Sequence, residues 1–363
     1  MLNYRTPGVY IEEISSLPAS IAQVETAIPA FVGYTSRRSR KRERIPKNTP
    51  FLIHSFEEYE KCFGGPFNES FSVTLQTNVT AVNNTSITIK PEISGLSKYL
   101  MHHCMQFYFG NGGGRCYIVS VGECYDDNSG EKSIRLDDLK AGLKSLEKED
   151  EPTVLVIPEA VNLGDEERKT LHEKILDQCG KLKDRFAILD VLEYGYTDSE
   201  ADAGRFRDKE TGVNNLAYGA AYYPSLQTTI RRFYDEKSVV ITDARKRVGR
   251  GSVDGKTLAE LTANENHKLL CRQIKKELNK MRVRLFPSAA IAGVYARVDR
   301  ERGVWKAPAN VSVNLTESPS KMLTNQDQRV LNVDADSGKS INAIRSFEER
   351  GTLVWGCQNS CRK

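Results

Sequence analysis

The middle of the chain alternates between helical and strand patterns, and this rhythm constrains the fold more than any other feature. Leucines at helical spacing predict an amphipathic helix over 136–147, and a second helix is predicted over 165–182. Continuous apolar runs at 153–158 and 186–191 follow them, as is typical of strands covered on both faces. Strand–helix–strand units form parallel sheets through right-handed crossovers. The sequence therefore predicts an α/β fold, a mixed sheet with flanking helices.

The flanking segments supply further elements and indicate how the chain is divided. Residues 67–95 are rich in Asn, Thr and Ser, which favours an inserted β-rich or loop-like segment. We expect strands at 30–34, 49–53, 116–121, 217–223, 291–298, 329–334 and 352–355, and helices at 56–63, 96–109 and 256–285. The predicted division is an extended N-terminal arm at 1–20, an α/β body at 21–35 and 96–356, an insertion at 36–95 and a tail at 357–363.

The first 20 residues lack the pattern of a globular segment. A Pro-Gly turn precedes three strong β-formers and two acidic residues, in the order Pro7, Gly8, Val9, Tyr10, Ile11, Glu12 and Glu13. One short strand at a terminus cannot stabilise itself. This arm therefore has to pair with another part of its own domain or with a neighbouring chain.

Composition excludes two classes of protein and argues against a third. The 363 residues include 52 basic and 48 acidic side chains, a net charge of +4 that is too even for a general nucleic-acid binder. No apolar run reaches the roughly 18 residues of a membrane span, and the first residues contain no apolar core of a secretory signal. With 39% hydrophobic residues, the chain is neither an integral membrane protein nor intrinsically disordered.

Eight cysteines in a chain of this length predict free, mostly buried thiols rather than a disulfide framework. Cys357 and Cys361 have the spacing of half a metal site, but no second pair of ligands lies nearby in the sequence. His102, His103 and Cys104 are consecutive, so their side chains point in different directions on a helix or a strand. We therefore expect no metal and no cofactor.

Three features could carry chemistry, and each has a structural alternative. The glycine run at 110–114 follows a helix and precedes a strand, so a helix end with a tight turn explains it better than a phosphate loop. Asp190 ends a predicted strand, where α/β active sites gather, but one carboxylate is no mechanism. The basic run at 36–44 is a nucleic-acid site or a solvated loop, and no aromatic residues interleave its charges. We predict no enzymatic activity.

The segment 289–310 is the densest in the sequence. A strand of small residues is predicted to lead into alternating charges, which can form an ion-pair network at a loop or a subunit contact. Pro308 and Asn310 favour a turn after it. The candidate residues for this structural or inter-subunit cluster are Arg297, Asp299, Arg300, Glu301, Arg302, Trp305 and Lys306.

This segment resembles a hallmark of contractile tail sheath proteins from phages and related injection systems. The family carries Gly-x-Tyr-Ala-Arg-x-Asp and then Gly-Val-Trp-Lys-Ala-Pro-Ala-Asn, which match 293–299 and 303–310. The arm at 4–13 resembles the family's Pro-Gly-Val-Tyr-Ile-Glu-Glu stretch. Segments 28–34, 107–121 and 216–224 are similar to family stretches in the same order, so the resemblance spans almost the whole chain.

The resemblance implies a structural protein and virion component of a bacteriophage tail or contractile injection system. Its subunits would stack as hexameric rings in a helical assembly around an inner tube, and contract to drive that tube through a target envelope. It implies partners in other sheath subunits, the inner tube protein, and baseplate and terminal cap components, with no nucleic acid and no direct membrane insertion. The implied location is the bacterial cytoplasm during assembly, then a virion tail or an extracellular particle. The arm would add a strand to a neighbouring subunit.

The sequence departs from the family after Gly356, where members typically continue into a tube-facing helix and a sheet for strand exchange. We therefore expect a chain without that region. Two alternatives stay open beside the sheath subunit. One is a truncated sheath paralogue that caps or modulates the sheath, and the other is an α/β nucleotide-binding enzyme.

Overall fold

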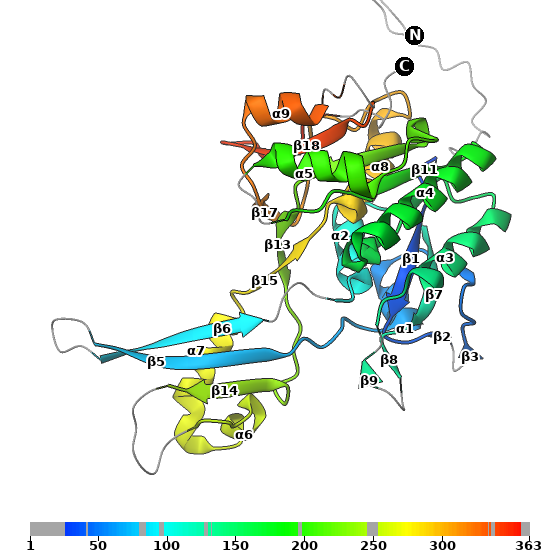
Figure 1. Cartoon of the computed structure of the whole chain (residues 1–363). Helices are drawn as coiled ribbons and strands as arrows, with labels where there is room; N and C mark the ends of the chain where they lie inside the picture. The colour runs from blue at the N-terminus through cyan, green and yellow to red at the C-terminus, as the bar shows by residue number, and fades with distance from the viewer. Residues whose placement is uncertain are drawn as a thin grey trace, which may run out of the picture.

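A computed structural model describes residues 26–40, 43–79, 85–93, 98–126, 130–131, 133–194, 198–244, 253–332, 334 and 338–356. The expected arm residues Pro7–Glu13 and the tail at 357–363 lie outside the described residues, as do Cys357 and Cys361. The described residues form a three-layered α/β body and a smaller unit that projects from it (Figure 1).

A nine-stranded mixed sheet forms the centre of the body. Its strand order is β16-β19-β18-β12-β11-β10-β1-β7-β4. The strands from β18 to β7 pair in parallel, and β16, β19 and β4 pair antiparallel at the two edges. The bounds are β1 Pro29–Thr35, β4 Pro50–Ile53, β7 Cys116–Glu123, β10 Val154–Val156, β11 Phe186–Asp190, β12 Gly219–Tyr223, β16 Val311–Ser312, β18 Ile341–Phe347 and β19 Gly351–Val354.

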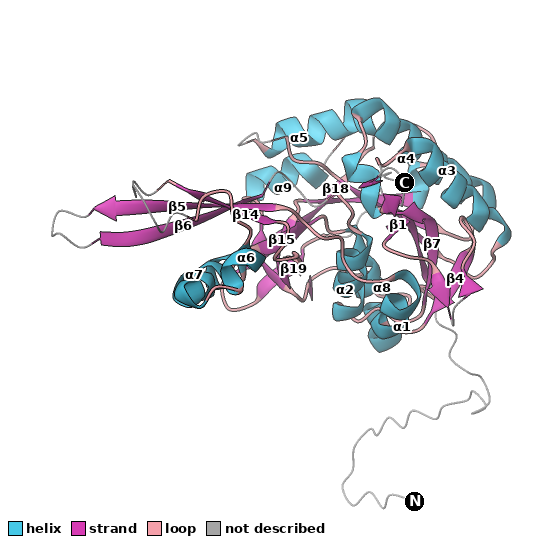
Figure 2. Ribbon diagram, turned by 90° about the horizontal axis from the view of Figure 1, so that it is seen from below, coloured by secondary structure: helices cyan, strands magenta, loops and turns pink. Residues whose placement is uncertain are grey.

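Helices cover both faces of this sheet (Figure 2). Successive residues of a strand point to opposite faces. Accordingly, Phe31 of β1 belongs to one core cluster, while Ala30 and Val32 belong to the other. The first cluster is covered by α1 Phe56–Phe63, α2 Met101–Gly110 and α8 Ser288–Arg302, the second by α3 Leu136–Ser145, α4 Asp165–Leu182, α5 Ser199–Arg205 and α9 Asn325–Asn332. The predicted fold class, a mixed sheet with flanking helices, is confirmed.

The projecting unit has its own small core. It contains β5 Phe71–Val79, β6 Thr85–Ile93, β14 Val239–Asp243, α6 Leu258–Thr262 and α7 Lys268–Leu278. Strand β5 pairs with β6 on one side and with β14 on the other, and the two helices cover one face of this sheet. Figure 1 shows the hairpin of β5 and β6 extending away from the body.

Buried charges fasten the projecting unit to the body. Nη1 of Arg232 donates to both carboxylate oxygens of Glu69, at 3.0 and 2.9 Å, and the two side chains are 8% and 4% exposed. Nε of Arg232 donates to the carbonyl of Arg282 at 3.0 Å, and the backbone amide of Glu69 donates to the carbonyl of Phe233 at 3.2 Å. These contacts join three of the segments that connect the unit to the body, near Glu69, Arg232 and Arg282. A small sheet of β13 Leu226–Arg231, β15 Arg282–Leu285 and β17 Thr316–Pro319 lies next to them.

The structure divides the expected insertion at 36–95 between the two parts. Strand β4 pairs with β7 in the main sheet, and α1 packs in the core of the body. Only β5 and β6 belong to the projecting unit, and their partner β14 comes from more than 140 residues later. The sequence pattern could not place β14 there, because strand partners are chosen by tertiary packing.

Two predicted elements have the wrong type, and a third is divided. The predicted strand at 291–298 is helix α8, and the predicted strand at 329–334 is α9. The predicted long helix at 256–285 is divided: Thr257 and Asn264 each cap a short helical segment, α7 follows, and the predicted segment ends in strand β15. Alternating Val283 and Leu285 are buried in β15, which pairs with β13, a strand the sequence analysis did not predict. Strands β14 and β18 were also missed.

The remaining short elements are β2 Ser39–Arg40 with β3 Glu43–Arg44, β8 Tyr125–Asp126 with β9 Gly130–Glu131, the 3₁₀ turns Leu146–Lys148, Pro158–Asn162, Leu216–Tyr218 and Glu265–His267, and the π-helical turn Phe206–Glu210.

Candidate assembly site

Helix α8 carries the charge cluster at its carboxyl end, and Asp190 fixes its amino end. One oxygen of Asp190 accepts the amide of Ser288 at 2.8 Å, and the other accepts the Ser288 hydroxyl at 2.5 Å. Burial raises the pKa of Asp190 to about 7. The carboxylate that ends β11 therefore caps a helix, which accounts for a buried acid at this position without catalysis.

Close packing against α2 determines where the end of α8 lies. A Cβ atom at Gly293 would lie 2.4 Å from the carbonyl oxygen of Tyr108, so only glycine lets the two helices approach this closely. This approach brings the glycine run that follows α2 beside the last turns of α8.

The glycine run forms the helix end and tight turn that the sequence predicted. Helix α2 ends at Gly110, and Gly112 has a φ of +91°. The Arg300 guanidinium donates to the carbonyl of Gly112 at 3.2 Å. The buried Asn111 side chain accepts the amide of Asn314 at 2.7 Å and donates to its carbonyl at 3.2 Å. The turn is a structural support for α8 and for the segment after it.

The charges of the cluster bind other segments of the chain. Thr26, the first described residue, donates its hydroxyl to Asp299 at 2.8 Å, and Arg297 donates to the carbonyl of Ser312. Burial lowers the pKa of Arg297. Glu301 and Arg302 are exposed. Within the described part of the chain, none of these charges forms an ion pair with another member of the cluster, and an ion-pair network at a subunit contact stays a prediction.

A turn with an exposed apolar surface follows α8. Gly303, with a φ of +84°, ends the helix, and its amide donates to the backbone carbonyl of Asp299 at 3.0 Å. The Trp305 ring lies over Gly303, where a Cβ would come within 2.4 Å of it, yet 85% of Trp305 is exposed. Val304 is 59% exposed, and the exposed Lys306 donates its amide to Gly303 at 3.1 Å.

The turn is hydrogen-bonded to the last described strand, β19. Asn310 has a φ of +59°, and its backbone amide donates to the carbonyl of Val354 at 2.6 Å. Its side-chain oxygen accepts from Arg350 at 2.7 Å. The first described residue and the last strand, β19, therefore both adjoin the segment 297–312. Sequence reasoning found the segment but missed Thr26, Asn314 and Arg350, because these contacts link residues far apart in the chain.

The basic run at 36–44 is also used in the fold. Arg37 donates to the carbonyls of Glu60 and Lys61, at 2.9 and 2.8 Å, near the carboxyl end of α1, where cations are favoured. Arg38 is buried and donates to the carbonyl of Ile45 at 3.0 Å. These contacts favour a loop that is part of the fold over a nucleic-acid site, although Arg38 is buried rather than solvated as that interpretation expected.

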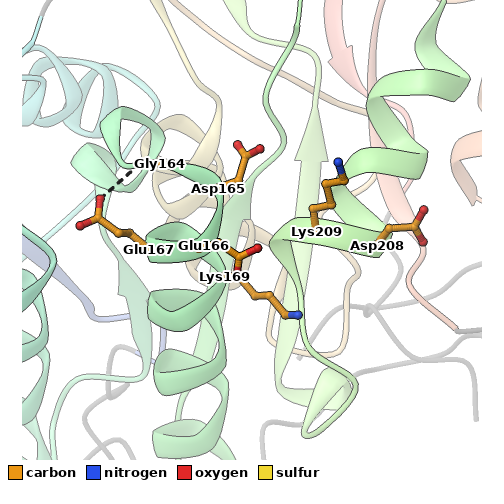
Figure 3. A pocket seen from close by; sticks show the side chains of 7 residues that line it. All are labelled: Gly164, Asp165, Glu166, Glu167, Lys169, Asp208 and Lys209. Carbon is orange, nitrogen blue, oxygen red and sulfur yellow. Dashed lines mark hydrogen bonds between the residues drawn. The ribbon is translucent and has the colours of Figure 1, made fainter.

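An open pocket of about 530 Å³ lies between the amino end of α4 and the π-helical turn (Figure 3). Asp165 is already paired with Arg168 at 2.7 Å, and Glu167 accepts the Gly164 amide at 3.4 Å. The lining contains carboxylates and amines without a Ser, Cys or His nucleophile: Gly164, Asp165, Glu166, Glu167, Lys169, Asp208 and Lys209.

The described residues agree with the expectation of free thiols. Six cysteines are free and buried: Cys62, Cys104, Cys116, Cys124, Cys179 and Cys271. Among the residues with described positions, no group of three or more His, Cys, Asp or Glu could hold a metal ion. None of the helices within the described ranges is long and apolar enough to cross a membrane.

Comparison with known proteins gives a result at the level of structure. No family model and no curated protein matches the chain. A chain in the 6-fold symmetrised baseplate of the anti-feeding prophage (AFP) matches with a TM-score of 0.54 and 24% identity, covering 99% of this chain and 69% of that chain. A chain in the contracted sheath complex of the extracellular contractile injection system PVC matches with a TM-score of 0.51 and 24% identity, covering 100% and 69%.

A third match is a chain in the contracted AFP helical sheath, with a TM-score of 0.52 and 24% identity, covering 98% of this chain and 69% of that chain. At this level of identity the likeness concerns the fold. The protein is thus an α/β protein whose mixed sheet and flanking helices are shared with chains of contractile-system sheaths and baseplates. It has the fold that the sequence resemblance led us to expect.

Proposed function

We propose that this protein is a structural sheath subunit of a contractile tail-like injection machine. It stacks in hexameric rings around an inner tube and contracts to drive that tube through a target envelope. The observation that carries the proposal is the fold likeness to AFP and PVC sheath complexes over at least 98% of this chain. The motif segments gathered around the end of α8 support it, because both Thr26 and the last described strand, β19, adjoin them.

The proposed partners are other copies of the subunit, the inner tube protein, and baseplate and terminal cap components. Neither nucleic acid nor direct membrane insertion is part of the proposal. Assembly takes place in the bacterial cytoplasm, and the mature location is a virion tail or an extracellular particle. The arm at 7–13 adds a strand to a neighbouring subunit, held by backbone hydrogen bonds. The protein is not an enzyme, a reading supported by the structural use of Asp190 and the glycine run.

Purified particles from cells that express the whole gene cluster test this proposal. We expect the protein as a stoichiometric component of the sheath, located in electron-microscopic maps by the projecting unit on each subunit. Its absence from intact particles would refute the proposal. As a second test, native mass spectrometry of the purified chain should detect no bound nucleotide, and a retained nucleotide would favour the enzyme alternative.

A further inference from the structure

Helices α3 and α4 lie side by side on one face of the main sheet (Figure 1), and an open groove of about 200 Å³ lies between them. Three of the residues that line this groove are lysines and one is a glutamate, so its net charge is positive and it attracts anions. The lining consists of Lys140, Leu143, Lys144, Glu147, Lys174 and Gln178.

Two of the lining lysines have no charged partner. Lys140 and Glu147 are each paired with a residue outside the lining, at 3.1 and 4.0 Å: Asp137 and Lys181. Lys144 and Lys174 are exposed, and neither forms an ion pair or a side-chain hydrogen bond within the described ranges. The groove therefore offers two free ammonium groups to an incoming anion.

The same groove contains a buried polar group without a partner. Gln178 is 5% exposed, and its Nε2 forms no hydrogen bond with any described residue. Buried donors are normally satisfied, so this amide is available to an acceptor that enters the groove. The lysine side chains beside it are long and flexible enough to move aside. A carboxylate at this place would accept from Gln178 and pair with Lys144 or Lys174.

The turn between β18 and β19 carries the complementary charges. Glu348 and Glu349 are exposed, and they are the only two adjacent exposed carboxylates in the described ranges that have neither a hydrogen bond nor an ion pair. Arg350, the next residue, is held back by the side chain of Asn310 at 2.7 Å. Strand pairing continues to the residues on either side of the turn, so the two carboxylates lie at the tip of a hairpin.

The turn and the groove lie in different parts of the body. Helix α3 packs on β1 and β7, where Gly142 lies against Val32 and Val121. The sheet places β10, β11 and β12 between β1 and β18. Neighbouring strands are about 4.8 Å apart, so β1 and β18 are about 19 Å apart across the sheet. A contact between the turn and the groove therefore joins two copies through different surfaces, and head-to-tail contacts of this kind generate rings or helices.

We propose that the groove between α3 and α4 receives the Glu348–Glu349 turn of a second copy. The two carboxylates pair with Lys144 and Lys174, and one of them accepts the amide of Gln178. This inference deepens the proposed function and rests on it for the arrangement of the copies in rings or a helix. It assigns the two surfaces through which one subunit holds the next.

Cross-linking with a carbodiimide tests the contact in the purified full chain. This reagent forms an amide bond between an amine and a carboxylate that are in direct contact. We mix unlabelled and ¹⁵N-labelled protein at high concentration and identify the linked peptides by mass spectrometry. We expect links from Lys144 or Lys174 to Glu348 or Glu349, with one labelled and one unlabelled peptide in many of them, which proves that two copies are joined.

Three variants keep this test independent of the loss of a reactive group. Gln178→Met retains all the linking residues and should lower the yield severalfold, because it removes the buried amide. Lys144→Glu with Lys174→Glu should abolish the links, as should Glu348→Lys with Glu349→Lys. An equal mixture of these two double variants should form links again, with the amine and the carboxylate exchanged and only between the two proteins.

Arg272→Glu with Lys276→Glu is the matched control. Both positions are exposed on α7 of the projecting unit, and neither has an ion pair in the described part of the chain. The yield should therefore stay unchanged, whereas raising the salt concentration should lower it in the parent protein. Far-UV circular dichroism and thermal melting check that every variant keeps the fold.

The docking proposal would be overturned if the parent protein gave no mixed-label links between these residues, or if the mixture of double variants stayed unlinked. This result would leave the sheath proposal standing, because the composition of particles tests it separately. Conversely, linked copies of a protein that is absent from particles would refute the proposed function and leave the contact between the copies.

Discussion

Glu159 makes the stability of this protein depend on pH in an uncommon direction. The side chain is fully buried in the 3₁₀ turn after β10, and its Oε1 accepts the amides of Leu100 and Met101 at 3.3 and 3.2 Å, at the amino end of α2. Burial raises the pKa of Glu159 to about 8, from an ordinary value of 4.5. The folded protein therefore holds a proton on Glu159 that the unfolded chain releases near pH 4.5.

The sign of the effect follows from this difference. Between pH 4.5 and about 8 the folded state binds more protons than the unfolded state, so the free energy of unfolding falls as pH rises. One group contributes at most about 1.4 kcal/mol per pH unit, which gives a loss of about 4 kcal/mol over three units. This contribution is fully present below pH 4.5 and is lost as pH rises through the folded-state pKa.

Glu159→Gln removes the titrating group and keeps an oxygen that can accept the two amides. We expect the variant to be within about 1 kcal/mol of the parent at pH 5. At pH 8.5 it should be more stable than the parent by about 3 kcal/mol, since the parent has by then lost most of the contribution. Asp190, whose pKa burial raises to about 7, adds a slope of the same sign in both proteins and cancels in the difference.

Urea unfolding at intervals from pH 5 to pH 9 measures this difference. Glu166→Gln, at an exposed position near the start of α4, is the matched control and should run parallel to the parent. Parallel pH profiles for Glu159→Gln and the parent would refute the reasoning, because they would mean that burial does not hold a proton on Glu159.

Three further predictions concern packing and the junction of the two parts. Arg232→Ala leaves the buried Glu69 carboxylate unpaired and should lower the free energy of unfolding by about 3–5 kcal/mol. Proteolysis at the base of the projecting unit should also become faster. Adding Glu69→Ala should recover part of the loss, and additive effects of the two changes would contradict the pairing. Gly293→Ala places a methyl group 2.4 Å from the Tyr108 carbonyl oxygen and should lower the free energy of unfolding by about 1–3 kcal/mol. The control is Gly204→Ala in α5, where no atom lies within 4 Å of the added methyl group, and it should be neutral or stabilising. Equal losses at both sites would contradict the close approach of α8 and α2. Leu75→Ala in the core of the projecting unit should lower the free energy of unfolding, measured by calorimetry, by about 2–5 kcal/mol. Val240 is 45% exposed on the same sheet, so Val240→Ala should lower this free energy far less.

Local patterns determined much of the body. The predicted helices at 56–63 and 165–182 have the bounds of α1 and α4, and the predicted strand at 116–121 lies within β7. These segments have strong periodicity or continuous burial, and their neighbours do not change their type. The glycine run was interpreted correctly for the same reason, since a helix before it and a strand after it fix the local conformation.

Tertiary contacts overrode local patterns elsewhere. The run from Ile291 to Val298 contains β-formers, but its alanines and Gly293 suit a helix that packs closely on α2. The run at 256–285 has helical composition, yet pairing with β13 makes its last residues a strand. Propensity is a weak determinant where packing or pairing with a distant segment is available.

The sequence by itself determined which segments of this protein are unusual: the arm, the glycine run, and the charges and turn around Trp305. Only the tertiary structure decided that the glycine run and the charges and turn around Trp305 lie together. Gly112 and Arg300 are 188 residues apart in the chain and are joined by a hydrogen bond, and Thr26 reaches Asp299 across 273 residues. These long-range bonds hold Arg300 and Asp299 of the cluster within the subunit. Spacing along a chain constrains neighbours on one helix, whereas contacts between distant segments depend on how the sheet and α2 position α8.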